Sequence, residues 1–557
     1  MKRIGIPKGR LVVSVAIILS GLSGVIAGGA AGASNSKAIL TVCNGTGGPY
    51  STNFNPLSAG SPTLTGSGGE DSLVYESLLQ FNYVNASEVI PWLATKYAWS
   101  NNGKTLTFDI RKNVHWSDGK LFTANDVVFT FNLLKKFPAL NLGGLNFTTV
   151  SAPNEWTVVI NLPVTSYSAL YYLASQLIVP EHIWSKIKNP TNDLNLNPVG
   201  TGPYLLKTFT TQNITLVKNP HYWGTGPAVS TIEYPTYYTN GAAEAALDTN
   251  SCQWGAPFLA STSKFYSSGH GSHTLWFPPT SSVMLIPNMT VYPLNILAFR
   301  QAVSDAIDRP AFAHNAEEGE EKAITNATGL VLPRDAGVLD PAYANDKLSL
   351  NLKAAKKTLV AAGFKYKGSA LYAPNGTRVK LSVSVPGGFS DWLAGMPTIV
   401  QNLSALGVDA TLDAPSDTVY LTDLADGSFD FAIWTQFSSG PGPFYQFDEM
   451  LNSSFSAPIG KSAVSNYGRW NNAATSAALN EYAATNNPAI QKKTMYTIEG
   501  IMVKQLPLFP LEYQVAFGEA NTKLFTGWPS PSHPYATLSP YVGNSNELVV
   551  LHIKPGS

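Results

Sequence analysis

Residues 199–224 read VGTGPYLLKTFTTQNITLVKNPHYWG, with two runs of alternating apolar and polar residues between two groups of turn-forming residues. Gly200, Gly202 and Pro203 predict a turn at the start of this stretch. The alternating runs predict a half-buried β-hairpin, because successive strand residues point to opposite faces of a sheet. The stretch pairs no nucleophile with a base, so we interpret it as a structural element.

Before this stretch, apolar residues at a helical spacing predict an α-helix over residues 70–81. Strict alternation predicts a strand over residues 106–110. Thr123 and Asp126 have the spacing of a capping box, which predicts the start of a second helix at this point.

After the stretch, helical and strand patterns alternate along the chain. Helices are predicted over residues 296–308, 351–362, 397–406 and 492–506. Strands are predicted over residues 379–385, 408–412, 429–434 and 506–517. This alternation is typical of the α/β fold class.

The length and the charge of the chain limit the number of domains and the classes of partner that we expect. A chain of 557 residues is too long for one hydrophobic core, so we expect two or more domains. Charged residues make up only 13% of the chain, against about 25% in an average globular protein. A net charge of zero argues against nucleic acid as a partner. A surface with few titrating groups leads us to hypothesise an acidic or otherwise harsh external medium.

The N-terminus has the pattern of an export signal. Basic residues within the first ten positions precede an apolar run over residues 11–26, and small residues follow up to Ala33. Residues 1–33 are therefore predicted to be a signal peptide, with an uncleaved membrane anchor as the alternative. We expect an exported, extracytoplasmic protein, in the periplasm or at the cell surface.

Motifs for catalysis and cofactor binding are missing from the sequence. It contains no GxSxG, HExxH or GxxxxGK[ST] motif, so we expect neither an enzyme nor a cofactor. His270 and His273 lie in the segment GHGSH, which we interpret as a polar loop and not as a metal site, because no carboxylate or cysteine is near. The acidic pair Asp448-Glu449 is interpreted as part of a solvated surface.

Cys43 and Cys252 are the only cysteines of the chain. Two cysteines are too few for a CxxC-type metal knuckle with four thiolates. In an exported protein they form either one disulfide or two buried thiols.

Aromatic residues are abundant, with 12 Trp, 25 Tyr and 25 Phe. Packing in the core explains most of them. Trp254, Trp276, Trp392 and Trp434 lie at predicted strand ends or in irregular segments. Flat rings at such positions suit the wall of a ligand pocket.

Several segments resemble, in the same order, motifs of the peptide/nickel class of ABC-transporter solute-binding proteins, the type 5 family of oligopeptide- and dipeptide-binding proteins. These segments are NFNPLSAG, VYESLLQFN, FDIRKNVHWSDGKLFTANDVV, GTGPYLL followed by NPHYW, FRQAVSDAIDR and AAKKTLVAAG. The resemblance extends over residues 41–549.

The resemblance implies an α/β, three-domain fold of the periplasmic-binding-protein type (class II), with two lobes that close on a cleft and an additional domain II. The implied ranges are 34–81, 197–287 and 511–557 for domain I, 82–196 for domain II and 288–510 for domain III. Cys43 and Cys252 both fall in domain I, which favours the disulfide.

The implied function is binding and not turnover. A monomeric solute-binding protein would capture a small-molecule solute, a peptide or an oligosaccharide, and deliver it to an ABC permease in the membrane. The alternatives are an exported hydrolase and a receptor-type binding protein on the same fold.

The implied ligand depends on the segment after the strand at residues 429–434. Peptide-binding members carry an aromatic residue here, followed by an Asp that pairs with the ammonium of the peptide. Trp434 matches the aromatic residue, but Phe437, Ser438 and Ser439 stand where the Asp is expected. A buried ammonium without a partner is costly, so an uncharged, hydroxyl-rich ligand such as an oligosaccharide is favoured.

The resemblance also implies which residues reach the ligand. Except for Trp434, core packing or loop solvation is an alternative of equal weight for each. The candidates are Trp434, Gln436, Ser438, Trp254, Gln253, Asn55, Ser58, Tyr513 and Gln514.

Overall fold

The computed structural model describes residues 39–43, 49–58, 73–85, 88–259, 261–269, 271–317, 320–332, 334–435, 440–542 and 545–556. The predicted signal peptide and the candidates Gln436 and Ser438 lie outside these residues. Within the described ranges, no helix is both long enough and apolar enough to span a membrane.

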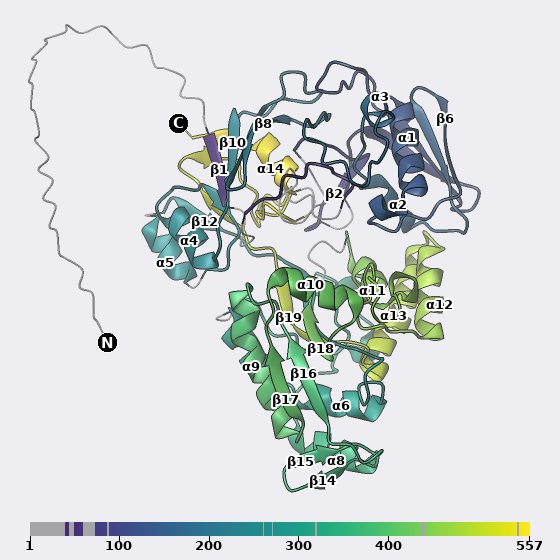
Figure 1. Ribbon diagram of the computed structural model, residues 1–557, viewed down its shortest axis with the longest axis vertical. Helices are drawn as coiled ribbons and strands as arrows, with labels where there is room; N and C mark the ends of the chain where they lie inside the picture. Colours follow the sequence, from purple (N-terminus) through teal and green to yellow (C-terminus); the bar gives the residue numbers. More distant parts are fainter. Residues whose placement is uncertain are drawn as a thin grey trace, which may run out of the picture. The chain divides into compact units, whose positions relative to one another are not determined.

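The stretch at residues 199–224 forms one edge of a mixed sheet, here called sheet I (Figure 1). Its strands follow the order β12-β20-β11-β1-β10-β9-β8. They are β1 (Ile39–Cys43), β8 (Tyr204–Thr210), β9 (Asn213–Lys218), β10 (Thr231–Pro235), β11 (Trp254–Gly255), β12 (His273–Leu275) and β20 (Glu519–Asn521). Strands β8 and β9 pair antiparallel, with Tyr204 opposite Lys218, so the predicted hairpin is confirmed.

The glycines before the hairpin mark a close crossing of two chain segments. The main-chain nitrogens of Gly202 and Tyr204 donate to Val74 O (2.9 Å) and Leu73 O (3.0 Å). A Cβ atom at Gly200 would lie 1.7 Å from Val74 O, a distance that no side chain can occupy. The glycine is therefore required by close approach of two backbones, and not only by a turn.

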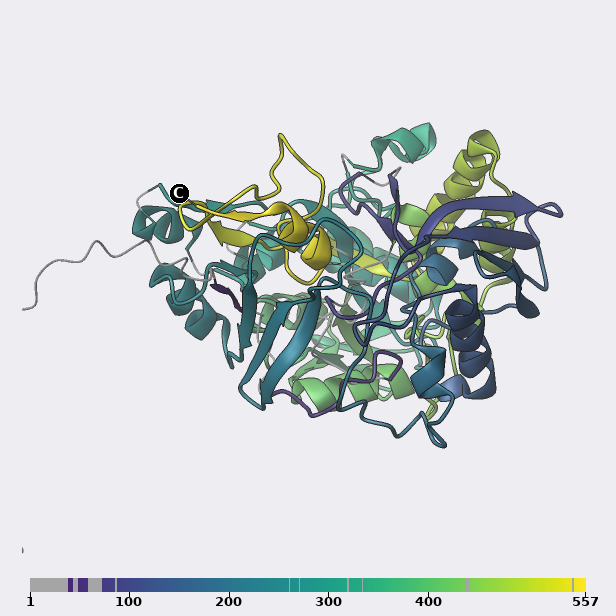
Figure 2. The same ribbon diagram turned by 90° about the horizontal axis from the view of Figure 1, so that it is seen from above.

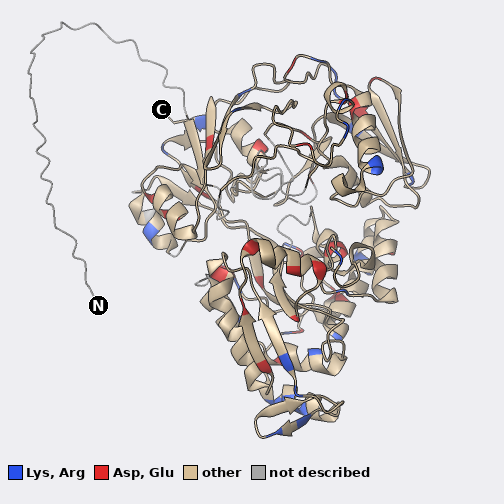
Figure 3. Ribbon diagram, viewed as in Figure 1, with Lys and Arg blue, Asp and Glu red and all other residues tan. Residues whose placement is uncertain are grey.

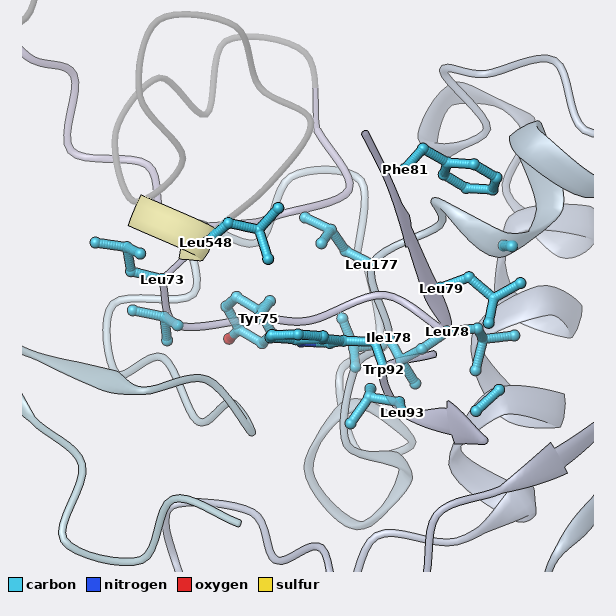
Figure 4. Packing of buried hydrophobic residues seen from close by; sticks show 14 of the residues in the cluster. Leu73, Tyr75, Leu78, Leu79, Phe81, Trp92, Leu93, Leu177, Ile178 and Leu548 are labelled. Atoms are coloured by element: carbon cyan, nitrogen blue, oxygen red, sulfur yellow. The ribbon is translucent and has the colours of Figure 1, made fainter. Parts of the chain in front are cut away.

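The helix predicted over residues 70–81 is wrong for the described residues 73–81. Residues 73–78 are irregular and lead into the short strand β2 (Leu79–Phe81). Apolar side chains from this segment are buried on all sides by neighbours such as Leu177 and Leu548 (Figure 4). A short apolar run fits a buried strand as well as a helix, and periodicity does not separate the two.

The end of the stretch packs on a buried carboxyl group. Trp223 Nε1 donates to Glu76 Oε2 (2.9 Å), and Trp92 Nε1 donates to Glu76 Oε1 (2.7 Å). The two indole rings contact each other edge to face, with centroids 5.5 Å apart. The YW pair of the stretch thus anchors the exit of the hairpin to the segment that carries Glu76.

A second sheet, sheet II, lies between the two halves of sheet I in the sequence and has the order β4-β5-β7-β6. Its elements are β4 (Ala94–Ser100), β5 (Thr105–Ile110), β6 (Thr149–Asn154), β7 (Thr157–Asn161), α1 (Ala124–Lys136), α2 (Ala169–Ala174) and α3 (Glu181–Trp184). The capping box at the start of α1 is confirmed: Thr123 N donates to Asp126 Oδ2 over 2.9 Å.

Sheet III has the order β17-β16-β18-β13-β19, with helices along it (Figure 1). Its strands are β13 (Pro279–Pro287), β16 (Lys380–Ser384), β17 (Asp409–Asp413), β18 (Phe431–Trp434) and β19 (Phe509–Val515). The accompanying helices are α6 (Leu297–Ala306), α7 (Arg309–Glu317), α8 (Leu352–Ala361), α9 (Ser390–Ala405), α10 (Asp417–Asp426), α11 (Pro443–Leu451), α12 (Ala473–Ala483) and α13 (Pro488–Gln505). The predicted α/β alternation is confirmed, although α9 begins before the predicted Pro397 and contains that proline in its interior.

The remaining elements are short or lie at the edges of the sheets. They are β3 (Val89–Pro91), β14 (Lys365–Lys367), β15 (Ala370–Tyr372), β21 (Phe525–Thr526), β22 (Lys554–Pro555), α4 (Asn240–Asp248), α5 (Thr262–Ser268) and α14 (Ser545–His552), with 3-10 turns at Pro138–Leu140, Ala336–Val338, Pro341–Tyr343 and Ser453–Phe455. Helix α14 lies beside sheet I in both ribbon views (Figures 1 and 2), and Tyr234 Oη of β10 donates to Asn546 Oδ1 of α14 (3.2 Å).

A hydrophobic core lies on each face of sheet III. Along β13, Val283 and Leu285 pack into one core of sheet III, while Met284 and Ile286 pack into the core on its other face. Lys, Arg, Asp and Glu are few and dispersed over the ribbon (Figure 3). A strand buried on both faces explains why residues 279–287 show no alternation of apolar and polar residues.

The structure contains a disulfide between Cys43 and Cys252, whose Cα atoms are 5.7 Å apart. It joins β1 to the segment before β11, inside a small core that includes Leu247 and Phe265. Of the two alternatives open from the sequence, the structure therefore has the disulfide and not two thiols.

Sheet membership differs from the predicted domain boundaries at two places. Strand β13 pairs with β18 and β19 of sheet III, although the predicted domain I extends to residue 287. The predicted boundary at residues 510 and 511 falls inside β19. Strand periodicity does not reveal which sheet a strand joins, so these two predicted limits do not coincide with the limits of the sheets. The domain limits themselves stay a prediction.

Candidate functional site

Sheets I and III are joined by a pair of adjacent extended segments. Residues 276–278 lead from β12 to β13, and residues 516–518 lead from β19 back to β20. Trp276 N donates to Gly518 O (3.0 Å), and Ala516 N donates to Pro278 O (2.9 Å). Short paired crossings of this kind can bend at a few residues while the sheets on either side stay rigid, which is the geometry of a hinge.

Trp434 is the last residue of β18, where it lies opposite Met284 of β13. Its half-buried ring contacts Trp392 edge to face at 6.2 Å and lies 6.1 Å from the ring of Tyr420. The hydroxyl of Tyr420 in turn donates to Ile433 O. Trp434 is thus held by aromatic neighbours at the end of a central strand, with part of its surface exposed, as a rigid ligand-stacking residue requires.

Hydroxyl groups cluster beside Trp434. Thr435 Oγ1 lies 2.7 Å from Ser281 Oγ and donates to Ser282 O (3.1 Å). Ser281 and Ser282 lie opposite Gln514 and Tyr513 of β19. The fold therefore brings the candidates Trp434, Tyr513 and Gln514 to the two strands of sheet III that flank β13, next to the hinge.

The side chain of Gln514 is used inside the protein. Gln514 Nε2 donates to Glu321 Oε1 (2.8 Å), which also accepts from Val515 N (2.8 Å). Glu321 and the neighbouring Glu512 are fully buried, and burial raises the pKa of both carboxyl groups well above the ordinary value. The Glu512 carboxyl raises the pKa of Glu321 further. The raised pKa values favour the neutral form of both acids, and in this form of the molecule both are buried near the hinge. The ligand role of Gln514 stays a prediction.

Asn55 and Ser58 lie in the loop at residues 49–58. Asn55 is fully buried; its Nδ2 donates to Pro190 O (2.9 Å) and Asp193 O (3.0 Å), and its Oδ1 accepts from Leu57 N. Ser58 Oγ accepts from Asn53 Nδ2 (2.8 Å). Both amide protons of Asn55 are therefore taken in this form of the molecule, and ligand contact by either residue stays a prediction.

Trp254 begins β11 of sheet I, and Gln253 directly precedes this strand. Gln253 Oε1 accepts from Thr41 N (2.8 Å), and its Nε2 donates to Asn250 O (2.8 Å). Trp254 is fully buried, and its Nε1 donates to Leu538 O (2.6 Å). The ligand role predicted for the two residues stays untested, and in this form they connect β1, β11 and the C-terminal segment.

A second set of residues, not predicted from the sequence, lines cavities between the sheet II helix α2 and the sheet III helix α11. In the described part of the chain, cavities of about 390 Å³ and 500 Å³ adjoin here, and Tyr172 lines both. Asp448 lines the second, and Glu449 the first. The signal available in the sequence was the aromatic spacing of YY at 171–172 and of FYQF at 444–447.

The interpretation of Asp448 as part of a solvated surface is wrong. Its side chain is buried; its Oδ2 accepts from Tyr172 Oη (3.0 Å) and its Oδ1 accepts from Asn452 Nδ2 (2.8 Å). Burial raises the pKa of Asp448 from 3.8 to about 6, against the lowering effect of these two hydrogen bonds. The carboxyl group lies on the side of α11 that faces α2, which no local sequence pattern reveals.

Of the two histidines in the segment GHGSH, His270 lies outside the described residues and His273 belongs to β12. His273 is buried, its Nδ1 lies 3.0 Å from Phe265 O, and its ring stacks on that of Phe265 at 4.4 Å. Among the residues that the structure describes, no group of three or more potential ligands could hold a metal ion.

Comparison with known proteins adds to this geometry. Residues 88–457 match the middle region of the bacterial extracellular solute-binding proteins, family 5. The chain is 27% identical to the nickel-binding periplasmic protein of Escherichia coli over 64% of its length and 69% of that protein. It is 26% identical to the dipeptide-binding protein of the same organism over 71% of its length and 75% of that protein.

Solved structures share the fold over nearly the whole chain. An oligopeptide ABC transporter periplasmic binding protein from Thermotoga maritima, crystallised with mannohexaose, has a TM-score of 0.83 and 25% identity, over 94% of this chain and 99% of that one. A Campylobacter jejuni protein in complex with nickel and L-histidine has a TM-score of 0.76 and 19% identity, over 93% and 99% of the two chains, and shows the fold alone. The chain therefore belongs to the bacterial extracellular solute-binding proteins, family 5, the class of binding proteins that serve ABC importers.

Proposed function

We propose that this protein captures a peptide or an oligosaccharide in a cleft between domains I and III and delivers it to an ABC permease. The observation that carries the proposal is the paired crossing of residues 276–278 and 516–518 between sheets I and III. A binding protein of this class needs two rigid lobes that separate to admit a solute and close to bury it, and such a crossing provides the bending point.

Between the two ligand classes, the chemistry beside Trp434 favours the oligosaccharide. Residues 435–447 contain hydroxyl and amide side chains but no carboxylate that could pair with a peptide ammonium. A partly exposed aromatic ring without a carboxylate beside it suits an uncharged sugar, whose ring stacks on the aromatic face. The Thermotoga maritima protein crystallised with mannohexaose supports the same choice.

A thermal-shift screen tests the proposal. Its arms are manno-, cello- and xylo-oligosaccharides, peptides of two to nine residues, and nickel with L-histidine. We expect an oligosaccharide to raise the transition temperature, because a ligand that binds only the folded state stabilises it. Stabilisation by peptides alone overturns the sugar assignment. Hydrolysis of any member of the panel, measured by mass spectrometry, overturns binding without turnover.

Export and assembly are part of the same proposal. The predicted signal peptide at residues 1–33 and the periplasmic relatives support an extracytoplasmic protein. That it works as a monomer with a membrane permease is part of the proposal. We expect N-terminal sequencing of the exported protein to begin near residue 34, and light scattering to give the mass of one chain. A retained N-terminus in the membrane fraction would instead support the anchor.

A further inference from the structure

The contact between Tyr172 and Asp448 links two parts of the protein that are far apart in the sequence. Tyr172 lies on α2, in the predicted domain II, and Asp448 lies on α11, in the predicted domain III. The Tyr172 hydroxyl donates to Asp448 Oδ2 over 3.0 Å. In this arrangement Asp448 is nearly fully buried.

Other contacts hold the same two parts together. Tyr445 Oη donates to Ser168 O (3.3 Å), and Tyr167 N donates to Ala483 O (2.6 Å). The rings of Tyr171 and Tyr445 are 4.8 Å apart. The groups that make these three contacts are neutral and stay neutral between pH 4 and pH 8. Among the groups that join the two parts, Asp448 is therefore the one whose charge responds to pH.

We propose that Tyr172 and Asp448 form a latch between the two parts, and that protonation of Asp448 favours the closed form in an acidic medium, because the latch then buries a neutral acid and not a charge. The proposal rests on the proposed function, because it takes α2 and α11 to separate when the protein opens. It adds a regulation of the binding site by pH.

The electrostatic surroundings of Asp448 set the direction of this effect. The titratable groups that act on the Tyr172–Tyr445–Asp448 cluster are Tyr172 on α2, Tyr445 and Glu449 on α11, Tyr482 on α12 and Tyr97 on β4. Burial raises the pKa of Tyr172 and of Tyr445 above the ordinary value of 10, so both remain donors. None of the described residues that line the two cavities is a lysine or an arginine. No lining cation therefore compensates an ionised Asp448.

Burial raises the pKa of Asp448 to about 6 in the contact, whereas 3.8 is the ordinary value for an exposed carboxyl. The closed form thus binds a proton more tightly than the open form. Closure gains strength as the pH falls from about 7 to about 4, and it changes no further below that range, because both forms are then protonated. Each pKa unit corresponds to a factor of ten in an equilibrium constant. The ratio of closed to open protein therefore increases by at most about 60-fold as the pH falls from 7.5 to 4.

The two cavities make the opening step accessible to water. Tyr172 is one of five residues that line both, and Asp448 lies on the wall of the second. A small separation of α2 from α11 therefore joins the cavities and hydrates the carboxyl group. Hydration removes the cause of the raised pKa, and the proton leaves as the latch opens.

The experiment uses the full protein without ligand, from pH 4 to pH 8. Small-angle X-ray scattering gives the radius of gyration, and hydrogen–deuterium exchange reports on residues 169–174 and 443–451. We expect the wild type to become more compact and better protected as the pH falls. Asp448→Asn, which resembles the neutral acid, is expected to stay compact across the range. Tyr172→Phe keeps the ring but loses the donor, so it is expected to open at a lower pH than the wild type.

Glu481→Gln is the matched control, because Glu481 is an exposed acid on the neighbouring α12. It is expected to follow the wild-type profile. The latch is overturned if the wild type shows no pH dependence, or if Asp448→Asn shows the same dependence as the wild type. These outcomes do not depend on the ligand. A wild type that binds no member of the screening panel contradicts the proposed function, whatever the compaction profile shows.

Discussion

Trp276 N donates to Gly518 O over 3.0 Å, which pairs the two segments that connect sheets I and III. The pair combines residues that are 242 positions apart in the sequence, and both lie within three residues of a strand in each sheet. Any rotation of sheet I relative to sheet III therefore has to bend these two connecting segments.

Gly518→Ala is expected to destabilise the protein by about 1–3 kcal/mol, because an added Cβ would lie 2.6 Å from the main-chain carbon of Leu538. Chemical denaturation followed by circular dichroism measures the loss. Gly226→Ala is the control, since no atom lies within 4 Å of a Cβ added there. Equal free energies of unfolding for the two variants would contradict this prediction, because the segment at Gly518 would then accommodate the added methyl group without loss of stability.

Loss of the disulfide between Cys43 and Cys252 is expected to lower the free energy of unfolding by about 2–5 kcal/mol, because the bond closes a loop across a sequence separation of 209 residues. Denaturant titration with and without reductant measures the change. Reductant should leave the Cys43→Ser/Cys252→Ser double variant unaffected. Two thiols that react with an alkylating agent in the denatured protein before reduction would contradict the bond.

Trp434→Ala is expected to weaken binding of the ligand found by the screen by at least about 2 kcal/mol, a factor of about 30 in Kd. The ring lies at the end of β18 with part of its surface exposed, so its loss should leave the fold intact. Calorimetric titration measures the affinity, and the far-ultraviolet circular dichroism spectrum checks the fold. Trp156→Ala, a half-buried tryptophan near sheet II, should bind as the wild type does. An unchanged affinity of Trp434→Ala would refute the role of this ring.

Stability is expected to fall as the pH rises from 5 to 8. Glu519 is fully buried, neither of its carboxyl oxygens has a hydrogen-bond partner, and burial raises its pKa well above 4.5. Burial also raises the pKa of Glu499 to about 7. The folded state holds these protons more tightly than the unfolded state, so their stabilising effect is complete below about pH 4.5 and is lost as the pH passes the folded-state pKa.

Thermal unfolding at pH 5, 6.5 and 8 measures this dependence. Glu519→Gln removes the ionisation while it keeps the size of the side chain, so it should stabilise the protein at pH 8 and flatten the profile by about 1.4 kcal/mol per pKa unit removed. Glu155→Gln, at an exposed position, should follow the wild type. A transition temperature that rises from pH 5 to pH 8 would contradict the burial of these acids in their neutral form.

The hairpin at residues 204–218, the capping box at Thr123 and Asp126, and the α/β alternation after residue 296 were predictable, because each depends on neighbours within a few positions. Local spacing fixes which face of a strand is apolar and how a helix begins. The ordered motifs were also sufficient for the family.

Other features depend on segments that meet only in the folded chain. The carbonyl groups of Leu73 and Val74 accept from Tyr204 and Gly202, more than a hundred positions away, and not from a following helical turn. Asp448 is buried because α2 covers it, and β13 joins sheet III through pairing with β18 and β19. Periodicity predicted most of the elements of this protein, and the resemblance of its ordered motifs predicted the family. Only the tertiary structure decided which sheet each strand joins, which acids are buried away from water and where two backbones cross. The reason is that long-range packing determines hydrogen-bond partners and solvation, and it leaves no local pattern in the sequence.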